Sequence, residues 1–496
     1  MFLAILLIWT LTLFYIYTNI SLRYWRMRNV FTKKPLPIFG NLFDVILGKD
    51  EFWTSISKIY NEIDDKYPYF GFYIFHKPIL VLKDINIIKQ VLVKDFNSFP
   101  NRTLHSNEKV DPVISNTLFV LKDDVWRTFR RKLSPIMSSG KMKLIIPSMQ
   151  EHAVNLEHCL ENSVEKNIDV KDLAKRFMLD AFASFAFGID YGSLQNKNLL
   201  MKQEHDRVFD QTKVMRRIGT FSWVFSPILV DIFRLPFMDM KYAHNLLDFY
   251  LQAEIDRKKE NIQRNDLLDI LIELSQQKSP NNVHEFDDLR RSAQAVLFSG
   301  TGTESTALPL ALGLHELACH PDIQDELRRE IYQNLDIDGN VTYESLNKMK
   351  YLDMVVKETL RLHPFLPFVT RYASEDYKIE STGLIIEKGT QILVPTRAIH
   401  KDPKYFPEPL KFKPERFLGE NMNKFQNVYL PFGAGPRKCI AERLSLIAMK
   451  YGIAACLKNF QVLVGEKTDL PLKFAKNSVF TSTEDGCVYL KIKRLI

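Results

Sequence analysis

Apolar and polar positions recur along most of this chain with a spacing close to the helical period. Residues 55–300 mainly follow that spacing. The stretch YFGFYIFHKPILVLKD at residues 69–84 departs from it and predicts an early pair of strands. Helical patterns continue to about residue 363, and turns with short strands are expected over residues 364–417. The pattern predicts a mainly α fold with small β-sheets, in the α+β class.

The first 22 residues, MFLAILLIWTLTLFYIYTNISL, carry no charge, and RYWRMR follows directly. At ~1.5 Å per residue this run reaches ~33 Å, enough to cross a bilayer core of ~30 Å. A cleaved signal peptide and a buried helix are the alternatives, but no basic n-region or small-residue cleavage site is visible. Because Arg23, Arg26 and Arg28 follow the run, we expect an uncleaved anchor with the rest of the chain in the cytosol.

A second apolar stretch, FSWVFSPILVDIFRLPF at residues 221–237, has apolar side chains on nearly every face. Such a stretch is typical of a helix buried in the core. Two other interpretations stay open: a pair of loops that dips into a bilayer beside the anchor, or a roof over an apolar pocket.

A third apolar stretch, residues 289–318, carries no charge between Arg291 and Glu304, which predicts an interior helix. Its middle reads GTGTEST. A buried Glu is costly unless it is paired or functional. The two glycines indicate that a ligand, or simply a neighbouring helix, approaches the backbone closely. Pro309 cannot donate to the carbonyl of Ser305, so we predict a kink or groove centred on residues 302–306.

Glu358 and Arg361 lie three residues apart in YLDMVVKETLRLHP and so share one helical face. Such pairs are common on protein surfaces. The proline-bounded turn FKPERF, residues 412–417, offers Arg416 as a second cation. A Glu between two arginines would lock this turn to the helix through bidentate contacts.

Composition narrows the classes of function. The 496 residues are 46% hydrophobic and 12% aromatic, which suits a large core and apolar cavities. The net charge of +8 comes from scattered basic residues, so nucleic acid is not the expected main partner, whereas an acidic protein or a membrane surface is. Five cysteines with no CxxC spacing argue against a disulfide framework or a cysteine-rich zinc site.

One of these cysteines stands in PFGAGPRKCIAERLSL, residues 431–446. Gly433 and Gly435 allow a tight turn whose backbone can approach a flat ligand. Apolar residues then recur at helical spacing from Ile440 to Ala455. Cys439 is therefore predicted near a helix N-terminus, where N–H groups and the helix dipole favour a thiolate. The residues leave two uses open, a metal ligand and a nucleophile.

PFGAGPRKCIA resembles the haem-binding signature F-x-x-G-x-R-x-C-x-G/A of the cytochrome P-450 family, the haem-thiolate monooxygenases. The N-terminal anchor with its proline hinge resembles that of this family, and other landmarks follow in the family's order: WRTFR at 126–130, TGTEST at 301–306, KETLR at 357–361 and PERF at 414–417. The resemblance covers essentially the whole chain and looks most like the microsomal enzymes of animals, those of insects included. It implies a P-450 fold with a transmembrane anchor at 1–22, a basic, proline-containing linker at 23–41 and a single haem-binding catalytic domain at 42–496.

The resemblance also implies roles for single residues. Cys439 is the expected axial ligand to the iron of haem b, with Phe432 near its sulfur and Gly435 permitting the turn. The haem propionates need positive charge and N–H donors. The residues expected to hold them are Trp126, Arg130, Arg371 and Arg437. The triad expected to support the cysteine loop is Glu358, Arg361 and Arg416.

Proton relay is expected from Glu304 and Ser305. The family pattern A/G-G-x-D/E-T-T reads TGTEST here, so Ser305 stands where a threonine is usual and Thr301 where an alanine is. Serine keeps the hydroxyl but loses the methyl group that restricts its rotamers. We therefore expect looser control of proton delivery, with some oxygen lost as peroxide.

The function that the resemblance implies is insertion of one oxygen atom from O2 into a lipophilic substrate. The electrons would come from NADPH through an acidic, membrane-bound NADPH–cytochrome reductase, with cytochrome b5 as a further candidate donor. The expected location is the endoplasmic reticulum (microsomal) membrane, with the catalytic domain on the cytosolic side. The alternatives are a reductase-independent haem-thiolate isomerase or dehydratase, and a non-catalytic haem-binding protein. The basic residues that could dock the reductase are Arg127, Arg131, Lys132, Lys438 and Arg443.

Overall fold

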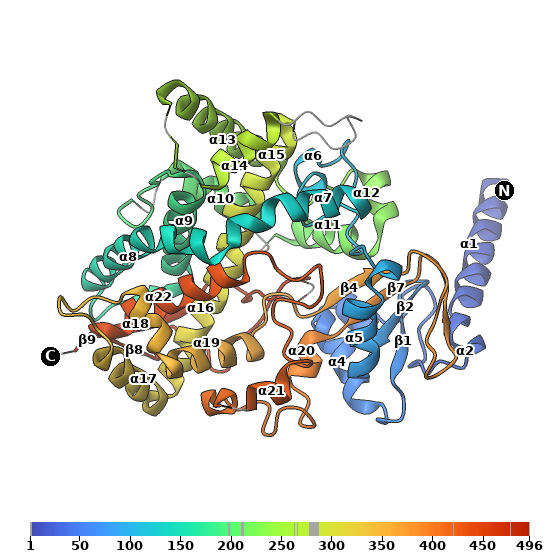
Figure 1. Cartoon of the computed structure of the whole chain (residues 1–496). Helices are drawn as coiled ribbons and strands as arrows, with labels where there is room; N and C mark the ends of the chain where they lie inside the picture. Colours follow the sequence, from blue (N-terminus) through green and yellow to red (C-terminus); the bar gives the residue numbers. More distant parts are fainter. Residues whose placement is uncertain are drawn as a thin grey trace.

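The computed structural model describes residues 2–196, 199–209, 213–261, 263–264, 266–276, 287–419, 421–476 and 478–495. Most helices gather on one side of the molecule and the larger sheet lies on the other, with α1 (Phe2–Ser21) projecting beyond it (Figure 1). The predicted mainly helical fold with small sheets is confirmed.

The first half of the chain supplies helices that surround the centre of the molecule. In chain order they are α2 (Tyr24–Met27), α3 (Phe43–Ile46), α4 (Phe52–Glu62), α5 (Ile85–Lys89), η1 (Gln90–Lys94), η2 (Phe96–Ser98), α6 (Pro112–Ser115), α7 (Asp123–Leu133), η3 (Ser134–Met137), α8 (Ser139–Glu161), α9 (Val170–Phe187), α10 (Leu200–Phe209), α11 (Val214–Phe225), α12 (Pro227–Phe233), α13 (Met240–Glu260) and α14 (Leu267–Gln276).

The second half supplies the central helix and those that pack beneath it. They are α15 (Asp288–Val296), η4 (Leu297–Thr301), α16 (Gly302–Cys319), α17 (Pro321–Gln333), α18 (Tyr343–Lys348), α19 (Lys350–Leu362), α20 (Thr396–His400), η5 (Pro414–Phe417), α21 (Asn421–Phe425) and α22 (Glu442–Lys458). Several helices begin at an aspartate whose carboxylate accepts a backbone N–H of the first turn, which satisfies a donor that the helix cannot. These aspartates are Asp84, Asp111, Asp169 and Asp287.

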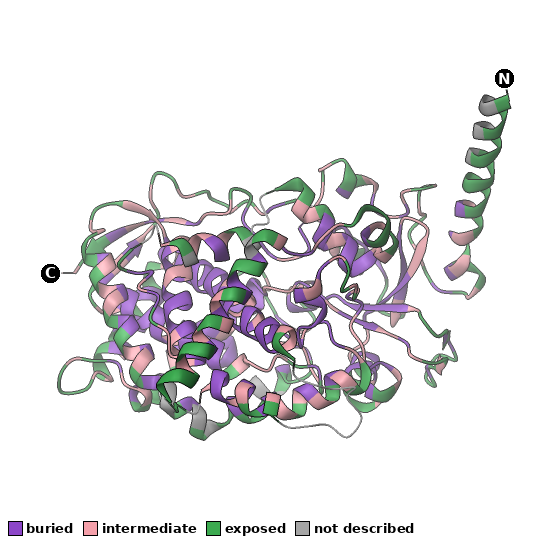
Figure 2. Ribbon diagram, turned by 90° about the horizontal axis from the view of Figure 1, so that it is seen from above, coloured by how far each residue is buried: buried purple, intermediate pink, exposed green. Residues whose placement is uncertain are grey.

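The core lies around α16, which packs against α9, α19 and α22. Most of its side chains are buried, as its apolar sequence predicts, and the buried positions concentrate in this helical part (Figure 2). A Cβ at Gly302 would make only ordinary contact with the ring of Phe182 from α9, at 3.4 Å, whereas one at Gly313 would lie 3.1 Å from the hydroxyl of Thr359 on α19, which is a tight contact. The hydroxyl of Thr306 donates to the hydroxyl of Ser445, 3.1 Å away, and so links α16 to α22.

The predicted kink is misplaced by a few residues. The irregular backbone is the π-helical stretch η4, Leu297–Thr301, and α16 begins where it ends and continues through Pro309. A π-helical turn accommodates its extra residue locally, so the following helix stays regular. Such turns often mark functional sites.

Three sheets flank the helices. The larger sheet has the order β1 (Tyr69–Ile74), β2 (Lys77–Leu82), β7 (Gln391–Val394), β4 (Val369–Tyr372), and only the β2–β7 pair is parallel. The first two strands confirm the predicted early pair. Two smaller antiparallel sheets join β3 (Asn167–Asp169), β9 (Tyr489–Arg494) and β8 (Phe460–Leu463), and β5 (Tyr377–Lys378) with β6 (Ile385–Ile386).

Residues 221–237 do not form a single core helix. They fall into the end of α11 and the whole of α12, separated at Ser226. Trp223 at the end of α11 is buried, whereas Ile232 and Phe233 of α12 are each 65% exposed. Pro227 explains the break, because proline is favoured at the first position of a new helix and disfavoured inside one.

The segment after α1 is packed against the larger sheet. Trp25 is buried, and its backbone N–H donates to the hydroxyl of Tyr73 at 2.9 Å. Its ring lies against Gly71, where any Cβ would overlap it. Among the residues that the structure describes, no helix combines the length and the apolar character needed to cross a membrane.

Candidate functional site

The cysteine loop lies between Leu430 and the start of α22. Gly433 and Gly435 both adopt a positive φ, +73° and +71°, which favours glycine. The backbone N–H of Cys439 donates to the carbonyl of Phe432 at 2.9 Å and closes the loop. The helix predicted from the apolar spacing is confirmed as α22, and it begins three residues after Cys439.

Gly435 has the positive φ that the expected turn needs, and it also permits a close contact within the protein. A Cβ at this position would overlap the backbone carbonyl of Leu92 in η1. The close approach that the glycine permits is therefore to another part of the protein, while Gly433 is the glycine that lines the cavity described next. The loop needs Gly435 in order to dock on η1.

Cys439 faces a cavity of about 490 Å³ beside α16. Most of its wall is apolar, and the aromatic members include a stacked pair, Phe365 and Phe480, with ring centroids 5.3 Å apart. Residues of α11 and of the segment after α12 line it through Val224 and Phe237, which supports the interpretation of this region as a roof over an apolar pocket. The other apolar wall residues include Leu104, Ile114, Leu118, Phe119, Leu297, Phe298, Leu366, Phe368, Val369 and Val479.

The thiol of Cys439 experiences opposing influences. Burial raises its pKa, while the backbone N–H of Ala441 and the guanidinium groups of Arg102 and Arg130 favour the thiolate. The N–H donor and the two cations are what a thiolate ligand requires.

Arginines gather at the cavity wall beside the cysteine. Arg437 donates to the carbonyls of Pro100 and Leu121 at 2.8 and 2.9 Å, and its guanidinium lies 3.8 Å above the ring of Trp126. Arg102 donates to the carbonyl of Arg437 at 2.8 Å. The whole set at this wall is Arg102, Arg130, Arg371 and Arg437.

These four arginines lie without a carboxylate at ion-pair distance among the described residues, although the more distant Asp123 favours the charged form of Arg437. Burial, and then Arg102, lower the pKa of Arg371 to about 9, and burial followed by Arg102 and Arg371 lowers that of Arg437 to about 7. The Nε of Arg371 is buried without a hydrogen-bond acceptor. A flat group that carries two carboxylates, as haem does, fits this donor set.

Glu304 and Ser305 lie in the first turn of α16 and both line the cavity. The hydroxyl of Ser305 donates to the carbonyl of Gly302 at 3.3 Å. The carboxylate of Glu304 pairs with Lys175 at 2.8 Å and Lys171 at 3.5 Å, both on α9. Burial raises the pKa of Glu304, but the two ammonium groups outweigh it and bring the pKa down to about 2. Glu304 is thus an anion at neutral pH.

The lysine partner of Glu304 belongs to a chain of alternating charges. Lys175 also contacts Asp206 at 3.1 Å, and Lys202 joins Asp206 and Asp172 at 2.7 and 2.6 Å. The ion pairs therefore run from the cavity wall into α10, and they explain how a Glu in an apolar helix is tolerated.

The predicted Glu–Arg–Arg triad is confirmed. Arg361 binds both carboxylate oxygens of Glu358, at 2.7 and 2.8 Å, and Arg416 contacts the same carboxylate at 3.2 Å. All three side chains are buried. Arg416 also donates to the carbonyl of Glu408 at 2.9 Å, so the triad locks residues 408–416 to α19.

Most of the residues predicted for the site surround one cavity. Cys439, Phe432, Trp126, Arg130, Arg371, Arg437, Glu304 and Ser305 all line it, while Gly435 does not. Sequence analysis missed Arg102, Lys171 and Lys175. Arg102 lies in a loop and the lysines on a helix with many charges, so no local pattern distinguishes them from surface residues.

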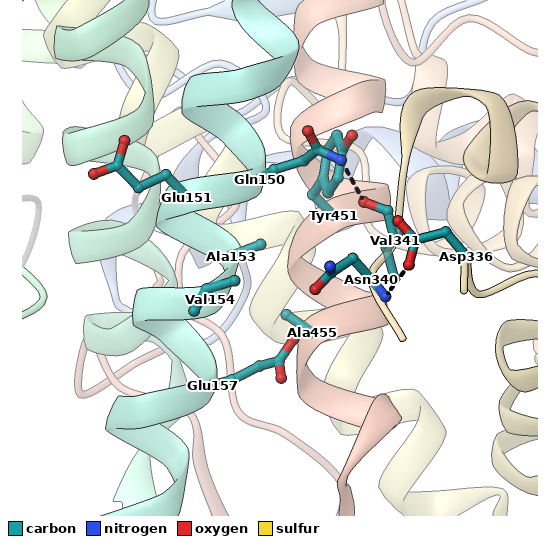
Figure 3. A pocket seen from close by; sticks show the side chains of 10 residues that line it. All are labelled: Gln150, Glu151, Ala153, Val154, Glu157, Asp336, Asn340, Val341, Tyr451 and Ala455. Carbon is teal, nitrogen blue, oxygen red and sulfur yellow. Dashed lines mark hydrogen bonds between the residues drawn. The ribbon is translucent and has the colours of Figure 1, made fainter. Parts of the chain in front are cut away.

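A separate pocket of about 360 Å³ lies between α8 and α22 and shares no lining residue with the cavity. Figure 3 shows Gln150 of α8 donating to the carbonyl of Val341 across it, a bond of 3.1 Å. The pocket contains none of the residues predicted for the site.

A helical fold that brings one loop cysteine and a set of unneutralised arginines to the same apolar cavity defines the class of haem-thiolate proteins. Comparison with known proteins identifies one family within this class. The family model of cytochrome P450 matches residues 31–489. The chain therefore belongs to the cytochrome P450 family.

The relatives that resemble this chain include insect cytochromes P450. The chain is 34% identical over 493 residues to the "Probable cytochrome P450 6a14" of Drosophila melanogaster, with 95% of each chain covered. It is 36% identical over 486 residues to the "Cytochrome P450 6j1" of Blattella germanica, which covers 97% of this chain and 95% of the relative. The expected likeness to insect enzymes is confirmed.

Membership of this family makes the chain a haem-thiolate monooxygenase, which inserts one atom of O2 into a lipophilic substrate with NADPH-derived electrons from a reductase. Haem with a thiolate ligand supplies the oxygen chemistry, because the thiolate pushes electron density onto the iron and favours O–O cleavage. The protein supplies a mostly apolar cavity wall, which also carries the arginines, the Glu304 carboxylate and the Ser305 hydroxyl.

Proposed function

We propose that Cys439 is the thiolate ligand of haem b, and that Arg102 joins Trp126, Arg130, Arg371 and Arg437 in holding the propionates. The observation that carries this proposal is the set of buried (Arg371, Arg437) and half-buried (Arg102, Arg130) arginines, none in an ion pair with a described carboxylate, which line the cavity that Cys439 faces. Phe432 lines the same cavity and its carbonyl accepts the N–H of Cys439, and Gly435 lets the loop lie against η1.

The carbon monoxide difference spectrum of the reduced protein tests this assignment. The wild type should show the red-shifted band of a thiolate-ligated haem, and Cys439→Ser should lack it. Cys487→Ser is the matched control, because Cys487 is a free, partly exposed cysteine outside the cavity. A wild-type protein without the band, or a Cys439→Ser variant that keeps it, would contradict the proposal.

The catalytic domain spans residues 42–496 in this proposal, residues 23–41 are the linker, and residues 1–22 anchor the chain in the endoplasmic reticulum membrane with that domain in the cytosol. The support is the uncharged N-terminal run followed by arginines, together with the exposed apolar side chains of α12. Removal of residues 1–22 should release most of the protein from microsomes. Ile232→Asp in the shortened chain should then weaken its remaining binding to phosphatidylcholine vesicles; unchanged binding in both experiments contradicts the proposal.

An NADPH–cytochrome reductase is the proposed electron donor at the cysteine side, with cytochrome b5 as a candidate second donor. The support is that α7 adjoins the cysteine loop through Trp126 and Arg437, and that Arg127 and Arg131 of α7 are exposed. The proposed docking face also includes Lys132, Lys438 and Arg443. Reversal of both charges on α7, Arg127→Glu with Arg131→Glu, should raise the Michaelis constant for reductase, and an unchanged constant would rule out this face.

The proton-handling groups in this proposal are Glu304 and Ser305, which lie side by side at the cavity wall. Because Glu304 is paired with Lys175, its carboxylate must leave the ammonium group before it can carry a proton into the cavity. In this proposal, the movement of the Glu304 carboxylate from the ammonium group of Lys175 into the cavity is the step that limits proton delivery. If the solvent isotope effect on product formation is the same in Lys175→Met as in the wild type, this step is not limiting.

A further inference from the structure

One fully buried histidine connects the triad to the cysteine loop. His400 is the last residue of α20, and its ring stacks on Tyr429 with centroids 5.6 Å apart and an interplanar angle of 18°. Its Nδ1 lies 3.1 Å from the carbonyl of Arg361, and its Nε2 lies 2.8 Å from the backbone N of Leu430. The two ring nitrogens thus bind two segments that are far apart in the sequence.

These contacts determine the protonation state of the ring. A carbonyl oxygen only accepts a hydrogen bond and a backbone N–H only donates one, so Nδ1 carries the hydrogen and Nε2 is bare. An imidazolium would place a second hydrogen against the N–H of Leu430. Burial, and then the charge of Arg361, lower the pKa of His400 to about 3, in agreement with a ring that stays neutral.

One end of this link is held by the triad. Arg361 binds the carboxylate of Glu358 through two nitrogens, and its remaining donor Nη1 contacts the carbonyl of His400 at 2.7 Å. His400 is therefore bound to Arg361 twice, once through its main chain and once through its ring. All three residues are buried, so little freedom is left at this end.

The other end is the first residue of the cysteine loop. The carbonyl of Leu430 accepts the N–H of Gly433 at 3.0 Å, and the carbonyl of Phe432 accepts the N–H of Cys439 at 2.9 Å. Leu430 is thus linked to Cys439 through two backbone hydrogen bonds, one between Leu430 and Gly433 and one between Phe432 and Cys439. Displacement of Leu430 would move the segment that bonds the backbone of Cys439.

We propose that His400 is a positioning residue, which through its Nε2 holds Leu430 and so keeps the Cys439 sulfur in register with the cavity wall. The inference rests on the proposed role of Cys439 as the haem ligand. The proposal explains how the buried triad can affect the cysteine. The imidazole of His400 binds both Arg361 of the triad and Leu430 of the loop, so Arg361 fixes where the loop begins. Neither the haem-binding signature nor the triad motif includes this residue.

Two substitutions separate the two ring nitrogens. In His400→Gln the side-chain oxygen lies near the place of Nε2 and can accept the N–H of Leu430. In His400→Asn the shorter amide lies near the place of Nδ1 and reaches only the carbonyl of Arg361. Both variants lose the stacking of the ring on Tyr429. A difference between them therefore reports the hydrogen bond to Leu430 and not the lost ring contact.

The first measurement is the rate at which the thiolate-type carbon monoxide band converts to the blue-shifted band in mild urea. We expect conversion to be about tenfold faster in His400→Asn than in His400→Gln, the factor typical of one lost hydrogen bond to a buried amide. The second measurement, hydrogen exchange at the amide of Leu430, requires no catalysis. This amide should be strongly protected in the wild type and in His400→Gln, and about tenfold less protected in His400→Asn.

Equal rates in the two variants would overturn the proposal, whether both match the wild type or both lose the band alike, because the bond to Leu430 would then make no difference. If neither variant folds, exchange in the wild type decides: a Leu430 amide that exchanges as fast as an exposed loop amide excludes the link. Failure of the underlying assignment looks different, since the wild type itself would then lack the thiolate band.

Discussion

Removal of one lysine from the cavity wall should raise the pKa of Glu304, the carboxylate with which it pairs. Lys175 contacts Glu304 at 2.8 Å, and Lys171, at 3.5 Å, is the other ammonium group paired with that carboxylate. In Lys175→Met the carboxylate stays buried beside the weaker cation alone. The effect of burial, which favours the protonated carboxyl group, is then opposed by one ammonium group instead of two, so the pKa of Glu304 should rise.

The structure sets the size of this effect. In the wild type the pKa of Glu304 is about 2 instead of 4.5, which corresponds to about 3 kcal/mol of carboxylate stabilisation. Because the folded-state pKa is lowered, this contribution is fully present above pH 4.5 and is lost as the pH falls towards 2. Because Lys171 remains beside the carboxylate in Lys175→Met, the free energy of unfolding should fall at pH 7 by part of these ~3 kcal/mol, and by progressively less below pH 4.5.

Urea unfolding of the wild type and the variant between pH 7 and pH 3 measures the difference. Lys202→Met is the matched control, because Lys202 pairs with Asp172 and Asp206 but not with Glu304. Infrared difference spectra, with the band assigned through Glu304→Gln, follow the carboxyl group directly. A Glu304 pKa that is the same in Lys175→Met and Lys202→Met would refute the assignment of the pKa to this ion pair.

Two further substitutions test the cavity. In Ser305→Thr the added methyl group restricts the hydroxyl rotamer, so the fraction of NADPH lost as peroxide should fall about two- to threefold; equal peroxide yields would show that Ser305 does not control coupling. The roof is held by Asp231 of α12, whose Oδ1 lies 2.8 Å from Nε2 of His105 and accepts from Asn107 at 2.7 Å. Asp231→Ala should therefore speed the entry of 4-phenylimidazole about tenfold, as measured by stopped-flow absorbance. Glu108→Ala, in the loop that contains His105 and Asn107, should leave the entry rate unchanged. Equal rates in the two variants would show that Asp231 does not hold the roof.

The sequence predicts those parts of the site whose partners lie within one segment. The apolar spacing after Cys439 predicts α22, and the spacing of Glu358 and Arg361 predicts a pair on one helical face. Gly435 shows the limit of such reasoning, because the need for glycine comes from Leu92, more than 300 residues earlier in the chain. The sequence reveals the glycine, but only the fold reveals what approaches it.

The unpredicted residues share a physical cause. Lys175 and Arg102 lie in stretches that also carry ordinary surface charges, and only the arrangement of helices turns them towards the cavity. The π-helical stretch η4 is missed because residues 292–303 carry no charge, so the sequence there shows no charged face whose shift would reveal an inserted residue. His400 is the clearest case, because both of its partners lie at least 30 residues away.

The two walls of the cavity differ in how their charges are balanced, and this difference has a consequence for folding. Glu304 is neutralised by Lys175 and Lys171, so its wall gains little from a ligand. The four arginines of the other wall form no ion pair with a carboxylate of the described residues, and burial with mutual repulsion brings the pKa of Arg437 to about 7 although Asp123 acts against this shift. A group that brings two carboxylates to this wall removes that repulsion and stabilises the native state by mass action. Haem loading should therefore protect the amides of the cysteine loop and α7 from exchange far more than those of α9 and α16.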